Sequence, residues 1–144
     1  MTAFRYTINN LRVGESDLGG VLYHANYYHL YEQAREALLT GEKLPYHQLV
    51  SAGCHLAVAE SGQKFLAPVY YGEALHIELS FREPTHVTVT AEYRISTERD
   101  HASACVHEGW TRLVFVKIQD GRFKASRFPE KLVEIFKKYS SQEA

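Results

Sequence analysis

Between positions 27 and 38, apolar residues recur at the spacing of an α-helix, and polar residues fill the positions between them. The apolar positions i, i+3, i+4, i+7 and i+11 are Tyr27, Leu30, Tyr31, Ala34 and Leu38. This spacing predicts a helix with one apolar face. Asn26 suits its N-cap, and Gly41 suits a left-handed residue at its C-terminal end. An apolar stripe of this length needs a sheet to bury it, which excludes an isolated surface helix.

Much of the remaining chain predicts strands with one buried and one wet face. Alternation of apolar and polar residues is clearest over 75–82 and 87–95, and a longer strand is expected over 103–118. Earlier strands are expected over 4–13, with a bulge at Asn9-Asn10, and over 54–69, with a break at Ser61-Gly62. Short helices are expected over 45–52 and 129–139, with a turn at Asp120-Gly121. One long helix with about five strands predicts an antiparallel α+β domain spanning residues 1–144.

Composition argues against several classes of protein. The net charge is −1, and 23% of the 144 residues are charged, so neither a nucleic-acid-binding nor a membrane-surface protein is expected. No apolar run has the length of a membrane span or the pattern of a signal peptide. Cys54 and Cys105 are far apart, and no ligand spacing joins them to the eight histidines. We therefore expect no metal site and reduced thiols in a cytoplasmic protein.

A carboxylate and two glycines directly precede the long helix. Asp17 is followed by Gly19 and Gly20, and the chain reaches the expected N-cap six residues after Gly20. Free backbone N–H groups and the positive end of the helix dipole gather at such a terminus. This arrangement can bind an anion or stabilise an oxyanion that develops during a reaction.

The same stretch resembles the signature of the 4-hydroxybenzoyl-CoA thioesterase family. Nearly every signature position is filled within about twenty residues: Asp17, Gly20, Val21, Tyr23-His24-Ala25-Asn26-Tyr27 and Glu32-Gln33-Ala34-Arg35. A second resemblance to that family lies in 65–75, where an aromatic residue, Pro68, Gly72, Glu73 and Leu75 match the connection between two strands.

The resemblance implies a hotdog fold, in which a curved antiparallel sheet wraps one central helix, and a thioesterase activity. It also implies that Asp17 is the catalytic carboxylate, acting as nucleophile or as general base for water. The backbone N–H of His24, at or next to the helix N-terminus, is expected to stabilise the oxyanion. The substrate is expected to contact the other matched positions and the strand that faces the site in relatives: Gly20, Val21, Tyr23, Asn26, Tyr27, Glu60 and Ser61.

Simpler interpretations exist for several of these residues. An Asp followed by Gly-Gly is most often a turn residue, and only the adjoining family pattern makes Asp17 a catalytic candidate. The side chain of His24 has two open roles: a proton shuttle or substrate-positioning group, or a structural group bonded to backbone. Glu32 and Arg35, spaced i and i+3, are expected to form an ion pair on the helix surface.

The resemblance further implies an acyl-CoA or acyl-carrier-protein substrate and a homodimer or homotetramer. No cofactor is expected, because Asp17 and backbone donors suffice for the chemistry. The residues 113–118 are apolar on both parities, as expected for a central or an interface strand. Two other functions remain open: a hotdog hydratase or dehydratase, and an acyl-CoA-binding module without catalysis. The sequence does not identify the acyl group.

Overall fold

The structure is a computed structural model and describes residues 3–9, 26–70 and 72–141. Its strands are β1 (Phe4–Ile8), β2 (Cys54–Phe65), β3 (Leu75–Arg82), β4 (Thr88–Arg99), β5 (Ala102–Gln119) and β6 (Arg122–Ala125). Its helices are α1 (Tyr27–Gly41), α2 (Tyr46–Ser51) and α3 (Glu130–Lys138). The expected strand over 4–13 is observed as β1, and residues 10–13 lie outside the described part.

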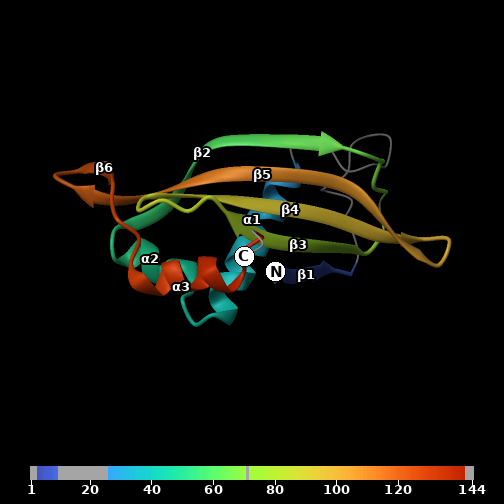
Figure 1. Cartoon of the computed structure of the whole chain (residues 1–144), viewed down its shortest axis with the longest axis horizontal. Coiled ribbons are helices and arrows are strands. Elements are labelled where there is room, and N and C mark those ends of the chain that lie inside the picture. Colours follow the sequence, from blue (N-terminus) through green and yellow to red (C-terminus); the bar gives the residue numbers. More distant parts are fainter. Residues whose placement is uncertain (1–2, 10–25, 71, 142–144) are drawn as a thin grey trace.

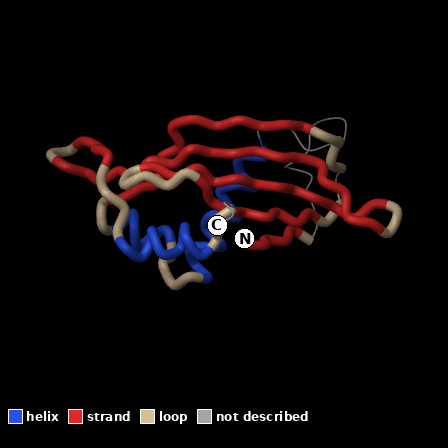
Figure 2. Tube along the Cα trace, in the orientation of Figure 1, coloured by secondary structure: helices blue, strands red, loops and turns tan. Residues whose placement is uncertain are grey.

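The strands form one antiparallel sheet in the order β1-β3-β4-β5-β2, and β6 pairs with the end of β5. In Figure 1 they lie side by side from β2 at one margin to β1 at the other, and α1 crosses behind them. Figure 2 shows the helices gathered on one side of the strands, with the β5–β6 hairpin projecting beyond them. The predicted α+β architecture is confirmed.

The core lies between α1 and one face of the sheet. The side chains of Leu30, Tyr31 and Ala34 have no exposed surface, as the spacing of the helix predicted. The facing strand residues alternate, so that every second side chain of β3 and β4 is buried. The apolar ones among these buried residues are Leu75, Ile77, Leu79, Phe81, Val89, Ala91, Tyr93 and Ile95. The helix therefore has the sheet that its apolar stripe required.

The C-terminal end of α1 differs from the prediction. Gly41 is the last helical residue, and the left-handed residue is Lys43, with φ 62°. The N–H of Leu44 donates to the carbonyl of Leu39 (2.9 Å), and the N–H of Lys43 donates to that of Thr40 (3.1 Å). These two bonds make a Schellman motif, which requires the left-handed residue two positions later than Gly41.

Strand β2 also differs from its prediction. It runs without a break through Ser61 and Gly62, and its irregularity lies between Val58 and Glu60. Gly62 pairs in register with Trp110, whose indole covers it: a Cβ on Gly62 would lie 2.4 Å from Trp110 Nε1. The glycine thus marks a close approach between strands rather than a strand end.

The sequence predicted the turn between β5 and β6, but it did not predict the short strand β6. Asp120 and Gly121 both have positive φ, 52° and 73°, which suits a two-residue hairpin of type I′. All four residues of β6 are exposed. A strand without a buried face has no alternation to reveal it in the sequence.

Candidate active site

The centre of the predicted site lies outside the described residues. Asp17, Gly20, Val21, Tyr23 and His24 belong to 10–25, so their roles stay predictions. The structure does describe the next residues of the chain, where α1 begins at Tyr27 and has Asn26 at its N-cap. The segment that carries the resemblance therefore leads directly into the N-terminus of α1.

Tyr27, the first residue of α1, packs against His107 and Phe65, and these three rings form an aromatic wall beside that terminus. Its side chain is 2% exposed. Its ring stacks on His107 of β5, with centroids 3.8 Å apart and an interplanar angle of 10°, and Phe65 of β2 meets both rings edge-on. Burial raises the pKa of Tyr27 to about 12, although Arg99 opposes the shift. A neutral phenol at this position offers an apolar ring and an O–H group.

Glu60 and Ser61 take different positions. Ser61 shares a hydrogen bond of 3.2 Å with the hydroxyl of Tyr28, in the first turn of α1. Glu60 accepts a 2.7 Å hydrogen bond from Arg112 in an exposed ion pair. Because successive strand residues point to opposite faces, Ser61 lies on the α1 face of the sheet and Glu60 on the other. Their predicted contact with substrate stays a prediction.

His107 is a candidate that the sequence analysis missed. It has no exposed surface, and its Nε2 is hydrogen-bonded to the hydroxyl of Tyr31. Burial lowers the pKa of His107 to about 4, so the imidazole is neutral near pH 7. The signal was available in the sequence, because counting back in steps of two from the buried Leu113 places His107 on the inward parity of the strand.

A layer of aromatic rings fixes Tyr31 in place. Tyr31 stacks on Tyr93 with centroids 4.0 Å apart. The hydroxyl of Tyr93 is bonded to Thr111 (2.7 Å) and accepts a bond from Arg35 (2.8 Å). The ion pair predicted between Arg35 and Glu32 is wrong: the salt bridges of the described chain do not include it, and Arg35 reaches into the sheet instead. Arg35 therefore stabilises the aromatic layer beneath the N-terminal half of the helix.

Arg99 binds two residues of the stretch 65–75 that carries the second family resemblance. Its guanidinium donates to the carboxylate of Glu73 at 2.9 and 3.2 Å, and to the carbonyl of Pro68. Burial tends to raise the pKa of Glu73, but the bonds from Arg99 and from the N–H of Tyr70 outweigh it and lower that pKa. Glu73 is thus an ion-paired carboxylate that orders the connection and is not a free base.

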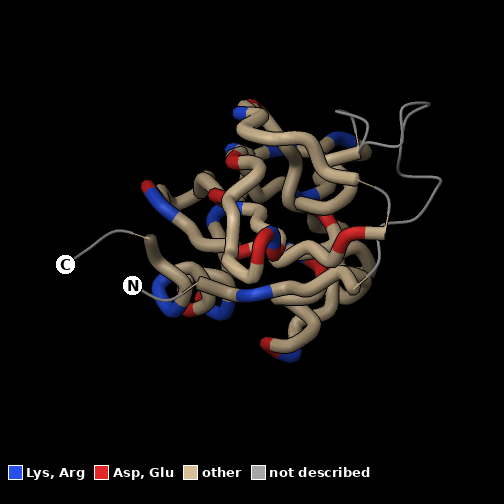
Figure 3. The backbone as a smooth tube through the Cα atoms, turned by 90° about the vertical axis from the view of Figure 1, so that its right-hand side faces the viewer, with Lys and Arg blue, Asp and Glu red and all other residues tan. Residues whose placement is uncertain are grey.

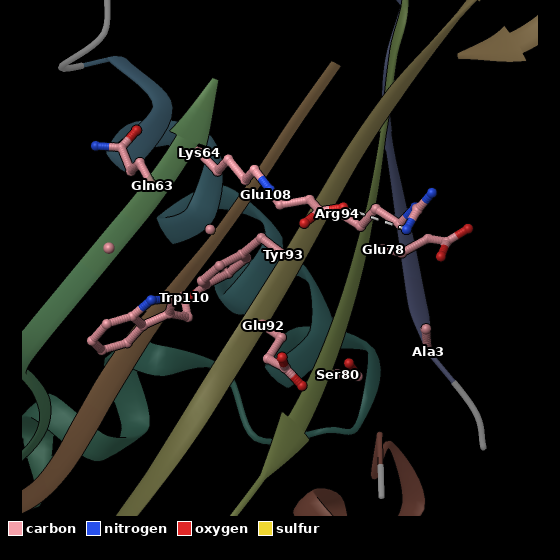
Figure 4. Close-up of a pocket in the computed structure, with 12 residues that line it drawn as sticks. Ala3, Gln63, Lys64, Glu78, Ser80, Glu92, Tyr93, Arg94, Glu108 and Trp110 are labelled. Atoms are coloured by element: carbon pink, nitrogen blue, oxygen red, sulfur yellow. Dashed lines mark ion pairs between the residues drawn. The ribbon is translucent and has the colours of Figure 1, made fainter. Parts of the chain in front are cut away.

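A groove of about 610 Å³ lies on the sheet face away from α1. Figure 4 shows Lys64, Glu108, Arg94 and Glu78 in a row across β2, β5, β4 and β3. They are register partners, and Arg94 and Glu108 form an ion pair of 3.6 Å. Figure 3 likewise shows acidic and basic residues intermixed along the backbone in that view. The charges of this row alternate in sign, and none of the predicted site residues lines the groove.

Within the described part, no group of three or more His, Cys, Asp or Glu side chains is placed to hold a metal ion. None of the helices described is long and apolar enough to cross a membrane. The described residues do provide an aromatic wall and neutral hydrogen-bonding groups around the first turns of α1. Such a wall suits an uncharged group held next to a helix N-terminus.

Comparison with known proteins bears on the whole chain. The family model of the thioesterase-like superfamily matches residues 11–136, which include the predicted site and most of the described sheet. A curated protein of Aquifex aeolicus, described as "Putative esterase", is 25% identical over 84 residues. That match covers 58% of this chain and 66% of the relative, just under two thirds of the relative's length.

Solved structures show the same fold. A hypothetical protein from Thermus thermophilus is 30% identical, with a TM-score of 0.78 over 94% of this chain and 98% of that one. The 4-hydroxybenzoyl CoA thioesterase from Pseudomonas sp. strain CBS-3 is 18% identical, with a TM-score of 0.83 over 94% of this chain and 99% of that one. The hotdog fold implied by the sequence resemblance is confirmed, and the chain belongs to the thioesterase-like superfamily.

Proposed function

We propose that this protein is a thioesterase that hydrolyses an acyl-CoA to the free acid and coenzyme A. The observation that carries the proposal is the dense family signature from Asp17 to Tyr27, which leads directly into the N-terminus of α1. The match to the thioesterase-like superfamily includes this stretch. Thioesterases of 4-hydroxybenzoyl CoA and 1,4-dihydroxy-2-naphthoyl-CoA are among the proteins of the same fold, which favours coenzyme A over a carrier protein.

In the proposed mechanism, Asp17 either attacks the thioester with its own carboxylate oxygen or removes a proton from the water molecule that attacks. The thioester carbonyl lies at the N-terminus of α1, where the N–H of His24 stabilises the oxyanion. Gly20 leaves room for the thioester to approach the backbone. The C–S bond breaks, and the thiolate of coenzyme A leaves and takes a proton. Where Asp17 attacks directly, water then hydrolyses the anhydride, and by either route the acid is released.

We further propose that the site lies between two subunits that meet at strand β2. This strand is the sheet margin and pairs only with β5 among the described strands. It exposes Val58 (51%) and Phe65 (54%), apolar side chains that an edge-to-edge partner would cover. Both cysteines are free, which suits a reducing compartment, and we place the enzyme in the cytoplasm.

The experiment that tests the activity is a thiol-release assay over short, long, branched and aromatic acyl-CoAs, with Asp17→Asn protein as the control. We expect release from at least one class of thioester, and release at least about 10²-fold slower in the control. Binding without release from any thioester would support an acyl-CoA-binding module instead. Conversion of an enoyl or 3-hydroxyacyl thioester without thiol release would support a hydratase or dehydratase.

A further inference from the structure

His107 lies where the interior of the sheet meets the start of α1. Its register partner on the marginal strand β2 is Phe65, and its ring is covered by Tyr27, the first residue of α1. Both aromatic contacts and the complete burial of the side chain fix the orientation of the imidazole. The histidine is therefore a rigid polar group in an apolar wall beside the helix N-terminus.

The hydrogen bond to Tyr31 determines which ring nitrogen carries the proton. Burial raises the pKa of Tyr31, so its hydroxyl keeps its one proton. Gly109 closes the space around that oxygen, since even a Cβ at Gly109 would overlap the Tyr31 hydroxyl. If the hydroxyl donates to Nε2 of His107, only Nδ1–H is left unpaired. The opposite arrangement would leave two groups unpaired, the hydroxyl proton and Nδ1, so the Nδ1–H tautomer is favoured.

Nδ1 of His107 is buried and has no hydrogen-bond partner among the described residues. A buried donor without an acceptor costs about 1–3 kcal/mol, so a native protein keeps one only where something compensates. Gln63 Oε1 is the other buried, unpartnered side-chain atom of the described chain. Gln63 pairs with Gly109 in the register, which places it diagonally across from His107 on the same face of the sheet.

We propose that Nδ1–H of His107 donates a hydrogen bond to an oxygen substituent of the acyl group, a hydroxyl or keto oxygen, and so selects oxygenated substrates. This inference rests on the proposed thioesterase function. Its basis is the combination of a fixed donor, an aromatic wall and a position next to the first turn of α1. A hydroxyl and a keto oxygen can both accept this hydrogen bond.

The neutral state of His107 fits this role. An imidazole whose pKa is about 4 is not protonated near neutral pH, so it can donate from Nδ1 without placing a charge in the wall. A site built to hydrogen-bond a substrate oxygen rejects the analogue that lacks it, because the buried donor is then left unpaired. His107 is thereby a specificity-determining residue, distinct from the predicted catalytic Asp17.

Three substitutions at His107 separate the two ring nitrogens. Asn carries its amide nitrogen as many bonds from the backbone as Nδ1, Gln carries its amide nitrogen at the distance of Nε2, and Phe keeps the ring without either nitrogen. The substrates are matched acyl-CoAs: butyryl-CoA against 3-hydroxybutyryl- and acetoacetyl-CoA, and benzoyl-CoA against 4-hydroxybenzoyl-CoA. The measured quantity is the ratio of kcat/KM for each oxygenated substrate to that of its plain partner.

In the wild type, at least one oxygenated substrate should be preferred by about 10-fold or more, as expected for one hydrogen bond in a buried site. His107→Phe and His107→Gln should lose about 10-fold of this ratio, whatever change they cause in kcat/KM for the plain partner. His107→Asn should keep the preference. A preference that persists in folded His107→Phe protein, or a wild type that shows none in any pair, would overturn the inference.

Failure of the proposed thioesterase function can be distinguished from failure of the inference on His107. If no thioester is hydrolysed, the thioesterase proposal fails, and the inference is then tested by binding. Non-hydrolysable thioether analogues of the same matched pairs are titrated by calorimetry into wild-type and His107→Phe protein. The affinity ratio between oxygenated and plain analogues should fall by about 10-fold in the variant. Equal ratios in the two proteins would overturn the inference whatever the catalytic result.

Discussion

The close contact between Gly109 and Tyr31 makes glycine essential at position 109. A Cβ at Gly109 would also lie 2.6 Å from Tyr31 Cζ, too close for any real contact. We predict that Gly109→Ala lowers the free energy of unfolding by about 1–3 kcal/mol, the usual cost of overpacking a core. Urea denaturation measures this change.

Gly41 is the matched control for that substitution. It is the last residue of α1, and an added Cβ would meet nothing within 4 Å. Gly41→Ala should therefore be neutral or stabilise the protein by up to about 1 kcal/mol through helix propensity. Equal stability of Gly109→Ala and Gly41→Ala would show that the Tyr31 ring is not fixed against the strand.

Buried His107 should make stability depend on pH. Its pKa is about 4 in the folded protein and 6.5 when unperturbed. Below about pH 6.5 the unfolded chain binds a proton that the folded protein excludes, so folding loses stability as pH falls towards 4. The loss reaches on the order of 3 kcal/mol at pH 4 and is absent above about pH 7.

The measurement compares urea denaturation of wild-type and His107→Phe protein at intervals from pH 7.5 to 4.5. The wild type should lose more stability over this range than the variant, because Phe does not titrate. Parallel curves for the two proteins would mean that the imidazole is protonated as readily in the folded protein as in the unfolded chain.

Among the helices and strands, the end of α1 carries a strain that can be removed. Lys43 occupies the left-handed position of the Schellman motif, where a residue with a Cβ costs about 1–2 kcal/mol. Lys43→Gly should raise the free energy of unfolding by about 1 kcal/mol after the entropic cost of glycine. Lys43→Ala, which keeps the Cβ, should stay within about 0.5 kcal/mol of the wild type. A stabilising Lys43→Ala would place the effect in the lysine side chain instead.

Elements were predictable from the sequence where their own pattern defines them. The helical spacing predicted α1, and clean alternation predicted β3 and most of β4, since each has one buried face. The irregularity after Val58 could not be foreseen, because it depends on how β2 pairs with β5. The partner of Arg35 was hidden for a similar reason: Tyr93 lies 58 positions away along the chain.

The candidate site, too, was predictable where a local sequence pattern defines it and not where it depends on tertiary contacts. The family resemblance pointed to Asp17 through Tyr27, and the structure places Tyr27 in the wall beside the start of α1. The parity of the strand indicated an inward side chain at position 107, but the complete burial of His107 depends on the register of β5 against β2 and on the position of α1. Only tertiary structure brings Tyr27, Tyr31 and Phe65 around it.

For the molecule as a whole, the exposed margin at β2 predicts association. One chain has a mass of 16.5 kDa, and we expect at least twice this mass in solution at micromolar concentration. Analytical ultracentrifugation combined with activity over a dilution series provides the measurement. Activity should fall as subunits separate, because the proposed site needs residues from both. A monomer with full activity would contradict the proposed interface.

Thioester hydrolysis by this protein depends, in our proposal, on Asp17, and Asp17→Asn tests that dependence. The substitution keeps the size of the side chain and removes its charge and most of its basicity. We predict that kcat for the preferred acyl-CoA falls by at least about 10²-fold, while KM changes much less and the melting temperature stays close to that of the wild type. A folded Asp17→Asn protein with unchanged kcat would contradict the proposal and leave Asp17 as a turn residue.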